Sequence, residues 1–155
     1  VFVNRHRGNM SDSKSMTIGD CACYNTRKAA RLLAQAYDRA LEPSGLKNTQ
    51  FIALAAISGS EDGLTITEMA VKMSVDRTTL TRNLGVLARN GLVRIDAGAD
   101  ARSKLVALTA TGRKALGKAI PLWEEIQSSI TDSLGNWSKL QREIEMLAEV
   151  AREAR

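Results

Sequence analysis

The sequence predicts a mainly α-helical fold with one small β-hairpin, on three observations in the middle of the chain. Residues 65–73 and 76–90 have the apolar spacing and the capping residues of two short helices joined by a turn. Residues 92–96 and 104–108 are typical of two strands joined by a short loop. The charged residues that follow the turn are mainly basic. This order of elements is that of a winged helix-turn-helix, which places its second helix in the DNA major groove.

The composition fits one globular domain that favours anionic partners. The chain has 155 residues, 44% hydrophobic and 25% charged, with a net charge of +5. No apolar run approaches the ~18 residues that span a bilayer, and the first residues lack the apolar segment of a signal peptide. We therefore expect a cytoplasmic protein without a membrane segment.

We expect residues 1–15 to form a disordered N-terminal extension, since Met10 is followed by a polar run, and residues 16–155 to form one domain. The only histidine, His6, lies in the extension, which excludes histidine-based catalysis and most zinc sites from the domain. The sequence has no glycine-rich phosphate loop and no paired carboxylates at metal-binding spacing. It predicts a protein that is not an enzyme and that has no cofactor and no metal.

The first predicted helix lies before the winged helix-turn-helix, which we place at about residues 48–110. Asp20 is suited to cap this helix, which ends near Leu41 because a Pro-Ser-Gly sequence follows. Asn48 or Thr49 then begins a second helix.

The helix-turn-helix itself has clear local signals. Thr65 and Glu68 match a capping box at the start of its first helix. Asp76 is suited to cap its second helix, and Gly91 to end it.

A long helix is predicted from Thr109, with a bend at Pro121 and a break at Gly135 before the last helix. The helices at about 20–43 and 110–153 carry more apolar surface than a winged domain of this size covers. We therefore expect them to pair in a homodimer, the most common oligomer and one suited to palindromic DNA.

The second helix of the pair is predicted to bind DNA through its N-terminal turns. Leu80 and Leu84 face the core at helical spacing, so their neighbours face outward. Threonine offers a hydroxyl to phosphate and a methyl to thymine, while arginine binds guanine or phosphate. The expected contacts from this helix are Arg77, Thr78, Thr79, Thr81 and Arg82.

The hairpin supplies a second set of expected DNA contacts. Arg102 is suited to the narrow minor groove, and Asp100 is placed to orient it by an ion pair. Arg94 and Lys104 would lie near phosphates. The alternative for Asp100 and Arg102 is an exposed surface pair that contributes little.

At these residues the sequence resembles the MarR family of bacterial regulators. The resemblance is carried by Asp76–Arg82, by Asn90–Val93, by Asp100–Arg102 and by Leu108–Gly112, and it extends from about Cys21 to the C-terminus. It implies a triangular homodimer with intertwined terminal helices. It also implies binding to a pseudopalindromic operator, usually to repress transcription.

The first helix also resembles that of the organic-peroxide-sensing branch of the family. Cys23 and Tyr37 match that branch's reactive cysteine and one of its tyrosines, while Asn48 replaces a second tyrosine. A thiol near a helix N-terminus, beside Arg27 or Lys28, is placed to be reactive. Its oxidation to a sulfenic acid, or to a disulfide with the other subunit, would shift the dimer and release DNA.

The two cysteines, Cys21 and Cys23, have other interpretations that the sequence leaves open. They are expected to be reduced in the cytoplasm, where they can simply pack at the dimer interface or line an effector pocket. A soft-metal site is a third interpretation, although no third ligand is near. A small-molecule effector would bind between the winged domain and the helical interface, where Tyr37, Phe51 and Trp123 are candidate lining residues better suited to the core.

A different class of function is also compatible with the fold. Some winged helices bind only proteins, and such a module would show no steep salt dependence of DNA binding.

Overall fold

The computed structural model describes residues 17–60, 62–98 and 103–154. It divides into two compact units, residues 1–33 and 34–155. The first unit holds a short 3-10 helix, η1 (Ile18–Asp20), and the start of α1 (Ala22–Leu41). The predicted extension at residues 1–15 lies outside the described residues.

The prediction that Asp20 caps α1 is wrong. Its carboxylate instead accepts hydrogen bonds from the backbone N–H of Thr17 at 3.2 Å and from the Thr17 hydroxyl at 2.9 Å. Cys21 occupies the position before α1, and its sulfur lies 3.4 Å from the backbone nitrogen of Tyr24, which donates to it. The helix therefore begins one residue later than predicted, because Thr17 competes for the carboxylate.

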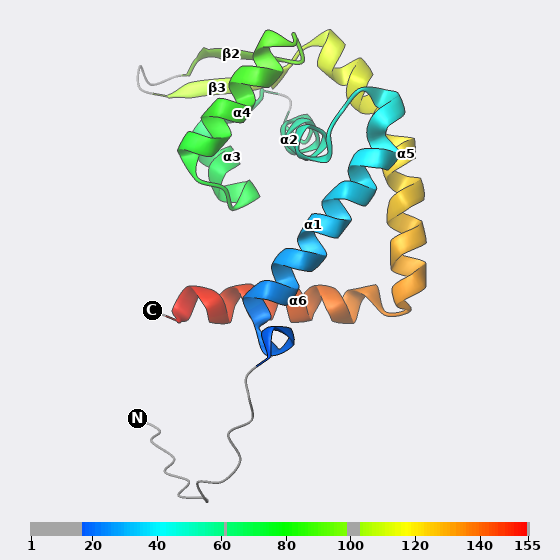
Figure 1. The fold of residues 1–155 in the computed structure, drawn as a ribbon. Coiled ribbons are helices and arrows are strands. Elements are labelled where there is room, and N and C mark those ends of the chain that lie inside the picture. The colour runs from blue at the N-terminus through cyan, green and yellow to red at the C-terminus, as the bar shows by residue number, and fades with distance from the viewer. Residues whose placement is uncertain (1–16, 61, 99–102, 155) are drawn as a thin grey trace, which may run out of the picture. The chain divides into compact units, whose positions relative to one another are not determined.

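The second unit contains the predicted winged helix-turn-helix, with one additional strand. Its elements are α2 (Asn48–Ser58), β1 (Leu64–Thr65), α3 (Ile66–Met73), α4 (Arg77–Arg89), β2 (Val93–Ala97) and β3 (Lys104–Leu108). The strands form an antiparallel sheet in the order β1-β3-β2, so β3 is the central strand. Figure 1 shows β2 and β3 side by side in the wing. The register pairs Val93 with Leu108 and Ile95 with Val106. The fold is thus mainly helical with a small wing, as predicted.

The capping residues predicted for α3 and α4 are confirmed. The Thr65 hydroxyl accepts a hydrogen bond from the Glu68 backbone at 3.2 Å, and the Glu68 carboxylate accepts one from the Thr65 backbone at 2.8 Å. The Asp76 carboxylate accepts one from the backbone of Thr79 at 2.9 Å. Ser74 supplies the left-handed residue of the turn, with φ of 51°. These bonds satisfy helix N–H groups that have no partner within the helix.

One hydrophobic core joins these helices to the sheet. Its fully buried members include Leu54 and Ile57 from α2, Met69 from α3, and Leu80, Leu84 and Leu87 from α4, with Val106 from β3. Phe51 and Trp123 stack on each other with ring centroids 5.8 Å apart, which fixes α2 against α5. The inward face predicted for α4 is therefore the observed one.

The long helix α5 (Ala110–Leu134) is attached closely to the end of the helix-turn-helix. Thr109 is its N-cap and accepts a hydrogen bond from the backbone of Gly112 at 2.9 Å. The Thr109 hydroxyl also donates to the carbonyl of Gly91 at 2.6 Å. A Cβ at Gly112 would overlap the carbonyl oxygen of Leu92, so only glycine fits there. The helix continues through Pro121.

The C-terminal helix α6 (Trp137–Glu153) differs from the others because none of its residues is buried. Gly135, with φ of 71°, separates it from α5, and the Asn136 side chain caps it by accepting from Lys139 at 3.0 Å. In the part of the chain that the structure describes, no helix has the length and apolar character to cross a membrane.

Candidate nucleic-acid interface

The first turns of α4 present the residues predicted to bind DNA. Leu80 and Leu84 are buried at 1% and 0% exposure, which turns the opposite face of α4 to solvent. All five predicted residues of this helix are exposed: Arg77, Thr78, Thr79, Thr81 and Arg82. The Thr81 hydroxyl donates to the Arg77 carbonyl at 2.7 Å, which leaves its lone pairs and its methyl group for a ligand.

Electrostatics at this end of α4 favour an anion beside the helix. The N-terminal N–H groups and the helix dipole carry partial positive charge, to which Arg77 and Arg82 add two full charges. Asp76 uses its carboxylate as the cap, and hydrogen bonds from the Thr79 side chain and backbone lower the pKa of that carboxyl. The arrangement can hold a phosphate or a base edge, because donors and cations share one exposed face.

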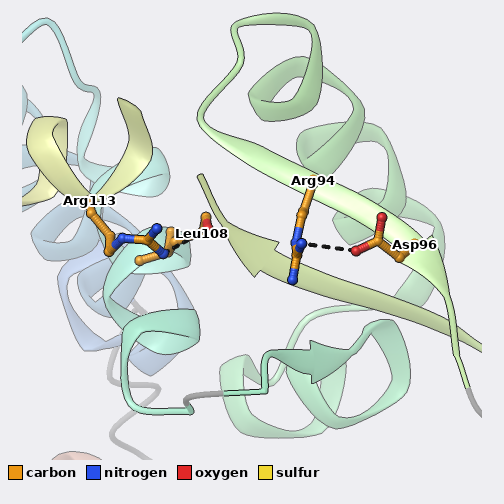
Figure 2. A network of polar contacts seen from close by, with 4 residues as sticks. All are labelled: Arg94, Asp96, Leu108 and Arg113. Atoms are coloured by element: carbon orange, nitrogen blue, oxygen red, sulfur yellow. Dashed lines mark hydrogen bonds and ion pairs between the residues drawn. The ribbon is translucent and has the colours of Figure 1, made fainter. Parts of the chain in front are cut away.

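The hairpin places its predicted residues differently. Arg94 lies on β2 with its Nε 3.2 Å from Oδ2 of Asp96, so this exposed cation has a partner on its own strand (Figure 2). Lys104 is exposed at the start of β3. Asp100 and Arg102 lie outside the described residues, so their ion pair and their minor-groove role remain predictions.

Two polar contacts here were not anticipated from the sequence. Residues two apart in a strand share a face, so the Arg94–Asp96 pair was available from the spacing alone. Arg113 of α5 donates through Nη1 to the carbonyl oxygen of Leu108 at 3.0 Å (Figure 2). No sequence signal pointed to this bond, since it depends on how α5 folds back against the end of β3.

The predicted sensing residues lie in both compact units. Cys21 is half-buried, Cys23 is exposed, and both are free thiols in the unit of residues 1–33. Tyr37 belongs to the other unit, where it is half-buried and its hydroxyl donates to Oε1 of Gln127. Burial raises the pKa of the Tyr37 hydroxyl. Among the described residues no group of three or more His, Cys, Asp or Glu side chains could hold a metal ion.

Phe51 and Trp123, considered as lining for an effector pocket, belong instead to the core stack described above. A cavity of about 710 Å³ in the second unit lies between α2, α3 and α4 and is lined by neither ring.

Comparison with known proteins supports this assignment of the fold. Residues 44–103 match the sequence model of the MarR family. The M. tuberculosis transcriptional regulator MosR, crystallised in complex with DNA, is 57% identical with a TM-score of 0.82, covering 88% of this chain and 99% of MosR.

Two further relatives match over shorter stretches. The uncharacterised HTH-type transcriptional regulator YwoH of Bacillus subtilis is 33% identical over 59% of this chain and 66% of its own length. The transcriptional activatory protein BadR of Rhodopseudomonas palustris is 31% identical over 68% of this chain and 61% of its own length. The chain thus spans less than two thirds of either relative. The chain belongs to the MarR family of winged helix-turn-helix, DNA-binding transcriptional regulators, which confirms the predicted family, fold and class of function and the expectation that it is not an enzyme.

Proposed function

We propose that the protein is a homodimeric repressor that binds a pseudopalindromic operator and leaves it on receiving a small-molecule or oxidant signal. The observation that carries the DNA-binding part is the exposed N-terminal face of α4, where Arg77 and Arg82 flank three threonines. Arg94, Lys104, Asp100 and Arg102 complete the proposed DNA contacts on the hairpin. Such a protein would act in the cytoplasm, where bacterial DNA lies.

The exposed apolar face of α6 supports the dimer. Ile144, Leu147 and Val150 are 49%, 40% and 58% exposed in the single chain, although they occur at helical spacing. A contiguous apolar face of this kind marks an interaction surface, and a second copy of the same helix offers a matching one. A twofold dimer would present two copies of α4, as a pseudopalindromic site requires.

Binding of fluorescent DNA duplexes at several salt concentrations tests the DNA-binding proposal. The duplexes are taken from the region beside the protein's own gene and compared with scrambled sequences. We expect the logarithm of the binding constant to fall linearly with the logarithm of salt concentration, because phosphate contacts release counterions. A flat salt dependence and equal affinity for scrambled duplexes would identify a protein-binding module instead.

Substitution on α4 makes the test specific. Arg82→Ala should weaken operator binding by about 1–3 kcal/mol if the side chain contacts a base. Arg89→Ala is the matched control, since Arg89 is an exposed arginine in the last turn of the same helix. Equal losses in both variants would show a general charge effect and contradict the assignment of the N-terminal face. Derepression of a reporter on deleting the gene tests whether the protein represses.

The oxidant signal is proposed to act at Cys21 and Cys23. An oxidised Cys21 could no longer accept the Tyr24 N–H bond in its present form, which would disturb the start of α1. A disulfide with the other subunit would instead link the two chains. We expect peroxide to weaken operator binding and Cys23→Ser to abolish the response. An unchanged response in Cys23→Ser, with Cys21→Ser as the parallel variant, would show that Cys23 is not the sensor.

A further inference from the structure

Gly85 occupies the interior of α4, where glycine is unfavourable. It lies within Arg77–Arg89, and its φ is not positive, so its backbone is that of an ordinary helix. In a helix interior glycine is less stable than every other residue except proline, because it has the most backbone freedom to lose on folding. A glycine at this position therefore needs a reason, either inside the chain or outside it.

The described part of the chain does not require the absence of a side chain at Gly85. Beyond the neighbouring residues and backbone of its own helix, a Cβ built there meets only Nη1 of Arg89 within 4 Å. The distance of 3.7 Å is an ordinary van der Waals contact with the end of a flexible side chain. By contrast, a Cβ at Gly112 overlaps the Leu92 carbonyl, and Gly91 has a φ of 68°. The reasons that explain those two glycines are missing at Gly85.

Gly85 lies on the side of α4 that is turned away from the core. Residues three, four and seven apart share a helix face. The glycine is thus in line with Thr78, Thr81 and Arg82, all of which are exposed. Leu84, the residue before it, belongs to the buried face at 0% exposure. Gly85 is therefore the next position along the row of residues that we propose to contact DNA.

The DNA major groove leaves little room around a helix that lies in it. The groove is about 12 Å wide, and an α-helix with its side chains is about 10–12 Å in diameter. Each side chain on the groove-facing side therefore affects how deep the helix lies. A position without a side chain lets the backbone come closer to a ligand, which is one of the common uses of glycine.

We propose that Gly85 is the position at which the backbone of α4 approaches DNA most closely, and that it sets the depth at which Thr81 and Arg82 reach the base edges. This inference rests on the proposed function, in which the exposed face of α4 contacts DNA. A side chain at position 85 would hold the helix away from the bases, while long basic side chains would still reach phosphates. Gly85 therefore acts on sequence-specific affinity more than on nonspecific affinity.

DNA binding by Gly85→Ala and Gly85→Leu tests the proposal on the full chain. The probes are a fluorescent duplex from the region beside the protein's own gene and a scrambled duplex of the same length. We expect affinity for the first duplex to fall by at least about threefold for Ala and about tenfold for Leu, with smaller losses on the scrambled duplex. The salt dependence should stay as steep as in wild type, because no charge is removed.

Thermal unfolding separates this role from a structural one. Gly85→Ala should raise the melting temperature by about 2–4 °C, because alanine is the better helix former and meets no overlap. Stability and DNA affinity should thus change in opposite directions. A lower melting temperature in both Gly85→Ala and Gly85→Leu would show that the chain itself needs the glycine, and would overturn the proposal.

Gly117→Leu is the matched control. Gly117 is an exposed glycine within α5, and a Cβ there meets no atom within 4 Å. The substitution adds the same side chain to a helix outside the proposed DNA-binding face, so operator affinity should not change. A loss equal to that of Gly85→Leu would mean that the effect does not come from contact at α4, and would overturn the proposal.

Gly85→Lys gives opposite results for a close contact and for open space. Where DNA lies against Gly85, the added side chain weakens operator binding despite its positive charge. Where the position is open, the added cation strengthens binding and steepens its salt dependence. We expect weaker binding, and stronger binding would overturn the proposal.

Arg82→Ala distinguishes a failure of this inference from a failure of the proposed function. Wild-type operator affinity in Gly85→Leu, beside weakened binding in Arg82→Ala, would refute the role of Gly85 and leave the α4 face in place. Wild-type affinity in both variants would refute the α4 face itself, and the role of Gly85 with it.

Discussion

The winged region, from α2 through β3, and the C-terminal helix α6 differ in where their apolar residues lie. In the winged region most of the large apolar residues of α2, α3 and α4 converge on one core, in which Leu54 and Leu84 are 0% exposed. In α6 the apolar residues have equally regular spacing, yet none is buried. Apolar residues at helical spacing therefore predict an amphipathic helix in both regions. They do not show whether its apolar face is covered by the same chain.

This difference indicates which part of the molecule can fold without a second chain. The winged region buries most of its large apolar residues within its own chain, together with residues of α5, so we expect its fold to need no second chain. A helix of 17 residues with an apolar face and no buried residue gains little stability from propensity alone. The stability of α6 should depend on a second copy, and that of the winged region should not.

Leu54→Ala is expected to have the largest effect. It removes a fully buried side chain from the centre of the core, at a cost of about 2–5 kcal/mol in the free energy of unfolding. Urea denaturation monitored by circular dichroism measures this loss. The difference between the variant and wild type should persist at every protein concentration. A difference that disappears on dilution would mean that the winged core itself depends on the dimer.

Two glycines of α5 differ in the space around them, because one packs against the winged region and the other faces open space. Gly112→Ala places a Cβ on the Leu92 carbonyl oxygen and should destabilise by about 3 kcal/mol, at the upper end of the overpacking range. Gly117→Ala meets open space and should stabilise the helix by roughly 0.5–1 kcal/mol. Thermal unfolding of both variants makes the comparison. Similar melting temperatures would contradict the tight junction between α5 and the winged region.

Leu147→Glu tests the open face of α6. A charge at the centre of an apolar interface should weaken the proposed dimer by at least about tenfold, or about 1.4 kcal/mol. Sedimentation equilibrium measures the change. Ser138→Glu adds the same charge at an exposed position on the side of the helix opposite Leu147 and should leave the dimer intact. Dimers of wild-type strength in Leu147→Glu would show that α6 is not the interface.

The parts of the fold that were predictable depend on local chemistry. The caps at Thr65, Asp76 and Thr109 each involve a side chain and a backbone group three residues away, so the sequence alone identifies them. The failure at Asp20 is also local, because Thr17 uses the same carboxylate. Strand β1 was missed because two residues show no alternation, and its pairing with β3 is a tertiary contact.

The candidate sites also divide into those that follow from local sequence and those that depend on tertiary contacts. The exposed residues of α4 follow from the burial of Leu80 and Leu84, which helical spacing predicts. The bond from Arg113 to the Leu108 carbonyl was not predictable, because α5 and β3 come together only after folding. Helical spacing also could not show whether the apolar face of α6 lies inside the chain or on its surface.

The smallest expected effect is an acid sensitivity of the caps in the winged region, which α6 should not share because Asn136 caps it. Hydrogen bonds from the Thr65 backbone and hydroxyl lower the pKa of Glu68, and those from the Thr79 side chain and backbone lower the pKa of Asp76. A carboxyl with a lowered pKa stabilises the folded state above its unfolded pKa. That contribution is lost as the pH falls through the lowered value.

The caps of α3 and α4 should therefore contribute fully at neutral pH and weaken below the ordinary carboxyl values of 4.5 for Glu68 and 3.8 for Asp76. The double substitution Glu68→Gln and Asp76→Asn retains capping side chains but removes both titrations, since glutamine and asparagine serve in the same positions. Urea midpoints measured between neutral pH and about pH 3 should fall less steeply in this variant than in wild type. An equal fall in both would show that other carboxylates cause the acid sensitivity, and that these caps do not distinguish the winged region from α6.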